Sequence, residues 1–110
     1  MTDRQRLPDR RLATTFTFQH TYPGSEPKTF TASVGHRPDG CVGEVFISLL
    51  DGTDKMSVDA HDAAVLLSLA LQHGASLADM GKAMLRGEDG KPHGWVGAAI
   101  DAILAMEEKA

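Results

Sequence analysis

Three residues in the first half of the chain, two histidines and one cysteine, are of types that commonly bind metal ions in proteins. His20 and His36 end two consecutive runs rich in Thr and Phe, and Cys41 follows five residues after His36. If the runs are neighbouring strands, these side chains could meet near a sheet edge, where a metal site needs three or four convergent ligands. Residues of these types are more often simple surface side chains. We therefore predict no metal site and no cofactor, with His20, His36 and Cys41 as the candidate ligands of the alternative, a metal-binding domain.

His61 and Asp62 are the only adjacent His–Asp pair. Catalysis needs a nucleophile, a base and a group that orients them. Consecutive helical residues project about 100° apart, so we do not expect this pair to form a dyad by itself. The glycines at 87, 90, 94 and 97 lack the spacing of a phosphate-binding loop. These features predict a protein without catalytic residues.

Binding to another protein fits the remaining residues better. Phe46 alternates with Val45 and Ile47, so it should lie with Glu44 on the opposite face of a strand. Residues 39–62 hold six acids against Lys55 alone, which makes Glu44 a candidate contact for a basic partner. The simpler interpretation is that the N-terminal segment covers Phe46 and that these acids are only solvated.

Trp95 lies beside the polar loop 86–94, and amphipathic rings in such places often anchor interfaces. In the simpler interpretation, Trp95 caps the hydrophobic core. In the folded part of the chain, the predicted partner-binding residues are Phe46, Glu44 and Trp95.

The N-terminal segment 1–11 carries four arginines and two aspartates, and Pro8 disfavours a helix there. We expect a flexible basic arm that is solvated, lies on an acidic partner or docks on a neighbour. Its Arg10 and Arg11 complete the predicted partner-binding residues. They could also contact phosphate, which leaves a small nucleotide- or nucleic-acid-binding regulator as an alternative. The net charge of −4 and the 5% aromatic content disfavour nucleic acid as the main partner.

These candidates need a scaffold, and three alternating segments predict strands over 14–20, 29–36 and 42–49. The connecting segments YPGSEP and RPDG have turn composition and are short, so neighbouring strands should be antiparallel. The residues expected to share the core face of this meander are Phe16, Phe18 and His20, then Phe30, Ala32 and Val34, then Val45, Ile47 and Leu49.

Helical periodicity follows the strands. A first helix should begin at Ser57 or Asp59 and stop at Gly74, and a second should be capped by Ser76, with Asp79 in its first turn, and end near Leu85. A third should run from about 95 to 108. The predicted apolar faces are Leu77, Met80 and Met84 in the second helix, and Val96, Ala99, Ile100, Ile103 and Leu104 in the third.

The first of these helices is unusually apolar, because the nine residues 63–71 contain only one polar side chain, Ser68. We expect this helix at the centre of the domain. Its two predicted contacts are with the sheet through Leu66, Leu67, Ala70 and Leu71, and with the two later helices through Val65 and Leu69. The predicted fold class is α+β: a three-stranded antiparallel β-meander followed by three α-helices packed on one face.

The strand GEVFISLL (43–50) and the helical segment DAAVLLSLALQHGASLADMGKAMLRG (62–87) resemble the small C-terminal domain of adenosylcobalamin-dependent ribonucleotide reductases. That domain is named for a Thr-Ser-Cys-Pro-Asp signature and also occurs in stand-alone bacterial and phage proteins, which RLPDRR and HGWVGAAIDAI resemble. The likeness covers roughly residues 14–87. The chain lacks the signature and has a single cysteine, so the resemblance implies a fold and an accessory role through a protein partner, but no reaction.

Length and composition limit the remaining classes. We expect the chain of 110 residues to form a single domain over 12–110, preceded by the arm. Its apolar content of 42% is ordinary for a globular protein. One cysteine excludes an internal disulfide. No apolar segment follows the N-terminal arginines, and the apolar stretch is too short to span a bilayer. We expect a cytoplasmic protein that binds a protein partner or a second copy of itself, and no membrane.

Overall fold

The computed structural model describes residues 3–50 and 54–109, apart from the side chains of Asp54 and Lys109. The first two residues of the predicted arm and Asp51 of the acidic segment lie outside this description. The elements are β1 (Ala13–His20), β2 (Lys28–His36), β3 (Val42–Leu49), α1 (Asp54–Gln72), α2 (Leu77–Ala83) and α3 (Trp95–Lys109). The strands form one antiparallel sheet in the order β1-β2-β3. The predicted α+β class, with a three-stranded meander followed by three helices, is confirmed.

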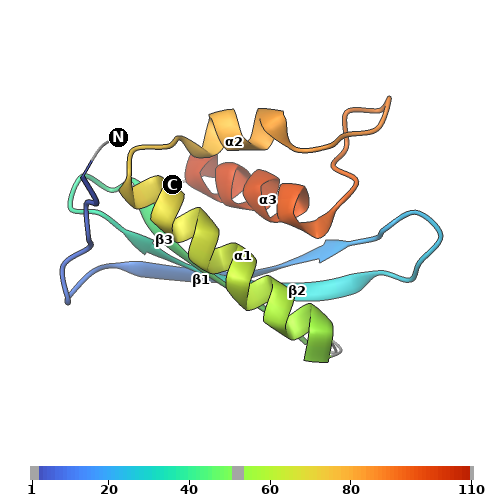
Figure 1. Ribbon diagram of the computed structural model, residues 1–110, viewed down its shortest axis with the longest axis horizontal. Helices are drawn as coiled ribbons and strands as arrows, with labels where there is room; N and C mark the ends of the chain where they lie inside the picture. Colours follow the sequence, from blue (N-terminus) through green and yellow to red (C-terminus); the bar gives the residue numbers. More distant parts are fainter. Residues whose placement is uncertain (1–2, 51–53, 110) are drawn as a thin grey trace.

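The sheet has one core face and one open face, as the alternation of residues predicts. Phe30, Ala32 and Val34 on β2 and Val45 on β3 are at most 1% exposed, and Ile47 is buried beside them. Phe18 stacks on Phe30, and Trp95 of α3 stacks on the same ring with centroids 5.4 Å apart. Figure 1 shows α2 and α3 above the sheet, with α1 crossing in front of it.

The ends of the helices agree only in part with the prediction. The Ser76 hydroxyl accepts the Asp79 N–H at 2.9 Å and caps α2, as predicted. Gly74 has a φ of 99°, a conformation that terminates a helix and that glycine adopts without strain. The predicted start of the first helix is wrong, because α1 begins at Asp54 and contains Ser57. A Lys55–Asp59 ion pair of 2.9 Å joins its first two turns.

The predicted central position of α1 is also wrong in part. This helix packs along the edge strand β3, so its buried residues form a narrow face of Ala60, Ala64, Leu67 and Leu71, followed by Gln72 at its C-terminal end. Leu66 is 68% exposed and does not cover the sheet. Val65 is 43% exposed and faces a groove rather than the later helices. The reason is geometric: a helix beside an edge strand has one side against the sheet and another side in the open.

The N-terminal segment lies against the open face of the sheet. Gly35 and Gly43 make room for Leu7, since a Cβ atom at Gly43 would lie 2.9 Å from the Leu7 side chain. Within residues 3–50 and 54–109, no helix has both the length and the apolar content that crossing a membrane requires.

Candidate functional site

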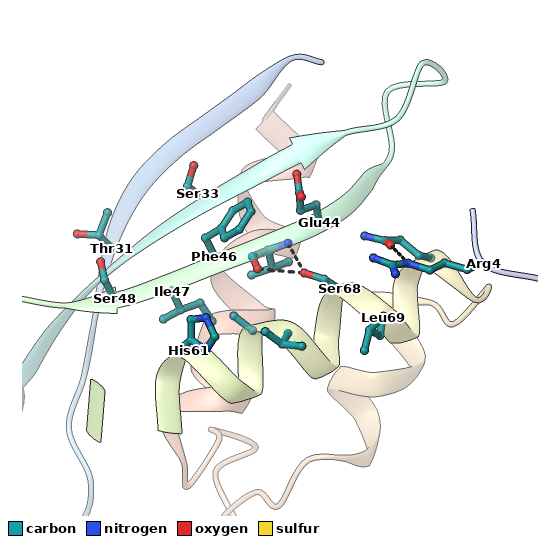
Figure 2. A pocket seen from close by; sticks show the side chains of 14 residues that line it. Arg4, Thr31, Ser33, Glu44, Phe46, Ile47, Ser48, His61, Ser68 and Leu69 are labelled. Atoms are coloured by element: carbon teal, nitrogen blue, oxygen red, sulfur yellow. Dashed lines mark hydrogen bonds between the residues drawn. The ribbon is translucent and has the colours of Figure 1, made fainter. Parts of the chain in front are cut away.

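A groove of about 370 Å³ lies between α1 and the open face of the sheet (Figure 2). This volume falls within the range of about 300–1,000 Å³ that is usual for ligand pockets. Phe46 and its neighbours on β2 and β3 form one wall, and α1 forms the other. The remaining lining residues are Thr31, Ser33 and Ser48 of the sheet wall, His61, Val65 and Leu69 of the helix wall, Val45, Ile47, Ala64 and Ser68 between the walls, and Arg4, Glu44 and Gln72 at one end.

The walls of the groove expose apolar surface to solvent. Phe46 is 56% exposed because the alternation of β3 turns it away from the core, and no helix covers that face. Val65 lies on the α1 wall and Leu69 is half-buried one turn further along. Single exposed apolar residues are common on protein surfaces, but grouped ones mark interaction sites. The groove therefore offers an apolar contact surface with a polar rim.

Ser68 lies between the two walls and fixes α1 to the edge of the sheet. Its Oγ accepts the Val45 N–H at 2.9 Å and donates to the Val45 carbonyl oxygen at 3.0 Å (Figure 2). These two backbone groups belong to an edge strand and would otherwise have no partner in the sheet. One hydroxyl thus satisfies both groups and sets the distance between the helix and β3.

Polar contacts between the arm and α1 close one end of the groove. Arg4 Nε donates to Gln72 Oε1 at 2.7 Å, and the Gln5 N–H donates to the Gln72 carbonyl oxygen at 2.6 Å. Gln72 is only 4% exposed, and its Nε2 donates to the Gly43 carbonyl oxygen at 3.1 Å. A buried amide satisfied in this way holds the arm, the end of α1 and β3 together.

The structure brings together two of the residues predicted to bind a partner. The Arg11 guanidinium donates two hydrogen bonds to the Glu44 carboxylate, from Nε at 2.8 Å and from Nη2 at 3.0 Å. A bidentate pair of this kind offsets both charges. Glu44 is therefore engaged within the chain, and the rim beside Phe46 carries less negative charge than the sequence suggests.

Like Arg11, the partner-binding candidates Trp95 and Arg10 do not line this groove. Trp95 is half-buried and stacks on Phe30 of the core. Arg10 is exposed, and no ion pair links it to another described residue.

The three candidate metal ligands do not converge. His20 and His36 lie at opposite ends of the β1–β2 ladder, where His20 Nε2 donates to the His93 carbonyl oxygen and His36 bonds to Thr14. Cys41 is exposed, and the neighbouring Asp39 raises the pKa of its thiol. Across the side chains that are described, no three His, Cys, Asp or Glu residues are placed to hold a metal ion.

His61 and Asp62 contact each other, contrary to the expectation from their helical spacing. His61 Nδ1 lies 3.2 Å from Asp62 Oδ1, and both side chains are at least 70% exposed. Water competes for a pair this exposed, so the contact is weak.

Several groove residues, above all Ser68, Val65 and Arg4, were not predicted from the sequence to be functional. A usable signal existed for Ser68, since it is the only polar side chain in residues 63–71. Arg4 approaches Gln72 across 68 positions of sequence, and no local pattern predicts such a contact.

The fold and the groove define a small α+β domain with one open sheet face. No family model, no curated protein and no solved structure matches this chain.

Proposed function

We propose that the chain is a non-catalytic binding module whose groove receives an apolar side chain of a protein partner. The observation that carries the proposal is the exposure of Phe46 opposite Val65 and Leu69 across the groove. Burying a large apolar side chain between such walls contributes roughly 1.5–3 kcal/mol. The Ser and Thr hydroxyls along the sheet wall and the rim of Arg4 and His61 supply polar contacts that orient the bound segment.

The resemblance of residues 43–50 and 62–87 to the reductase domain supports an accessory role for this module. In that role, the groove attaches the domain to an enzyme that carries out the chemistry elsewhere. The partner class is therefore a protein, and the module itself needs no cofactor.

The alternative proposal, a nucleotide- or nucleic-acid-binding regulator, depends on the arm arginines. Arg11 donates to the Glu44 carboxylate, so one cation fewer is available for phosphate than the sequence suggests. Arg4 keeps its charge, because its Nε donates only to the neutral Gln72 amide. Binding of an oligonucleotide that weakens with salt and disappears without residues 1–11 would favour this alternative.

Partner capture from the native host tests the main proposal with tagged wild-type, Phe46→Asp and Leu85→Asp proteins. Leu85 is 74% exposed and does not line the groove, so Leu85→Asp is a matched control for the change in charge and size. We expect Phe46→Asp to weaken partner affinity by about 30-fold or more, the loss typical of a central interface residue. Leu85→Asp should retain the partner. Equal retention by both variants, or no partner for the wild type, would overturn the proposal.

A further inference from the structure

The two edges of the sheet differ in how their backbone groups are satisfied. At the β3 edge, α1 lies alongside the strand and Ser68 bonds both backbone groups of Val45. At the β1 edge, no backbone hydrogen bond from another part of the described chain reaches the outward groups. One edge of the sheet is therefore closed and the other is free.

The pairing pattern identifies which groups of β1 point outward. In an antiparallel ladder, residues alternate between those that bond to the neighbouring strand and those that point away. Val45 points away from β2, so its partner Val34 bonds toward β1, and Thr14 opposite Val34 bonds back. The bond from the His36 N–H to the Leu12 carbonyl oxygen continues this pattern. The outward backbone groups of β1 are those of Ala13, Thr15, Thr17 and Gln19.

The composition of β1 favours pairing with another strand. Natural edge strands usually avoid pairing through lysines, prolines, bulges or short length. β1 has eight residues, ATTFTFQH, and contains no Lys, Arg, Asp, Glu or Pro. Its register with β2 runs without a shift from Ala13 to His20. None of these four features is present along this strand.

We propose that β1 pairs antiparallel with β1 of a second copy of this chain, which joins two sheets into one of six strands. A two-fold axis at Thr17 places the outward backbone groups of both strands opposite one another. The same register sets Phe16 of one copy opposite Phe18 of the second copy. Both rings are only partly buried in the single chain, and aromatic pairs across strands are favourable.

Charges beyond the ends of β1 are complementary in this arrangement. Antiparallel pairing brings the residues before β1 in one copy near those that follow β1 in the other. Arg10 precedes β1 and is exposed. At the other end of the strand, Glu88 and Asp89 line a wide cleft together with His20 and Thr21. Lys91 and Asp101 line the same cleft, and Asp101 is paired with Arg86. The arginine of one copy therefore approaches two acids of the other, whereas a parallel pair would bring like charges together.

The pairing of single strands is a small contact compared with the roughly 1,200–2,000 Å² of a stable interface. We therefore expect a dimer that dissociates on dilution. Sedimentation of the wild-type protein over a range of concentrations should show this equilibrium, and a monomer up to the highest soluble concentration would overturn the proposal.

Variants on the two edge strands locate the contact. Thr17→Lys places two lysines across the axis and should raise the dimer dissociation constant by about tenfold or more. Ser48→Lys makes the same charge change on the same sheet face but on β3, and it should leave the constant unchanged. Equal effects of both variants would overturn the assignment to β1.

A charge exchange provides a second test that does not depend on Thr17. Arg10→Glu should weaken the dimer, and adding Glu88→Arg to the same chain should restore it. Failure of the double variant to recover, with both proteins folded by circular dichroism, would contradict the antiparallel register.

Discussion

At the scale of single residues, Arg86 joins the last two helices. It donates two hydrogen bonds to the Asp101 carboxylate on α3, at 2.8 and 2.9 Å, and its Nη2 also donates to the Gly81 carbonyl oxygen at the end of α2. Those bonds lower the pKa of Asp101 below its ordinary value of 3.8, although partial burial opposes the shift. The segment between α2 and α3 is thereby fixed by one guanidinium.

A pH dependence follows from this pair. Because the pKa of Asp101 is lowered in the folded state, the pair stabilises the protein above pH 3.8, and the contribution is lost as the pH falls through the folded pKa. Arg86→Gln should therefore reduce stability more at neutral pH than in strong acid, where only its bonds to the Gly81 and Gly90 carbonyl oxygens are lost. NMR titration of the Asp101 carboxyl carbon in the wild-type and Arg86→Gln proteins measures the pKa of Asp101 directly. An unchanged Asp101 pKa in the Arg86→Gln variant would contradict the claim that Arg86 lowers it.

At the scale of elements, α1 exposes apolar residues on one side and buries them on the other. Leu67 is 6% exposed and Leu66 is 68% exposed, although they are neighbours of the same type. The exposed side follows from the position of α1 beside the edge strand. It also supplies one wall of the groove.

These two leucines provide a matched pair of stability measurements. Leu67→Ala should lower the free energy of unfolding by about 2–5 kcal/mol, because it leaves a cavity against β3. Leu66→Ala should change the same quantity by less than about 0.5 kcal/mol, because solvent already surrounds the side chain. Urea denaturation of both variants measures the difference. Similar losses would mean that α1 packs differently.

The strands and the later helices were predictable from the sequence because each has a single apolar face. Phe30, Ala32 and Val34 recur at every second position, and Ile100 and Ile103 follow helical spacing. The orientation of α1 was not predictable in this way. A helix with apolar residues on most of its circumference has no unique buried side, so Leu66 and Leu67 could not be distinguished.

The groove was only partly predictable for a related reason. The alternation of side chains along β3 predicts that Phe46 points away from the core. This alternation can be read from residues that are adjacent in the sequence. The opposite wall depends on where α1 lies relative to β3, and the bond from Ser68 to Val45 spans 23 positions of sequence. The pairing of Arg11 with Glu44 is equally distant, which is why the sequence overstates the free charge near Phe46.

At the scale of the whole molecule, three helices protect one face and one edge of a small sheet. The opposite face carries Phe46 and the groove, and the opposite edge is the uncharged strand β1. The two proposed contacts use different surfaces. The second copy would pair along β1, while the groove beside β3 would stay available to a partner protein.

The most direct test of this account is amide hydrogen exchange at the two sheet edges, measured by NMR in dilute and concentrated protein. We predict slow exchange at Val45 under both conditions, because its N–H is bonded to Ser68, and loss of that protection in Ser68→Ala. The amides of Thr15 and Thr17 should exchange fast in dilute protein and slowly in concentrated protein. Fast exchange at Val45, equal to that of Thr15 and Thr17, would contradict the claim that α1 closes one edge and leaves the other free.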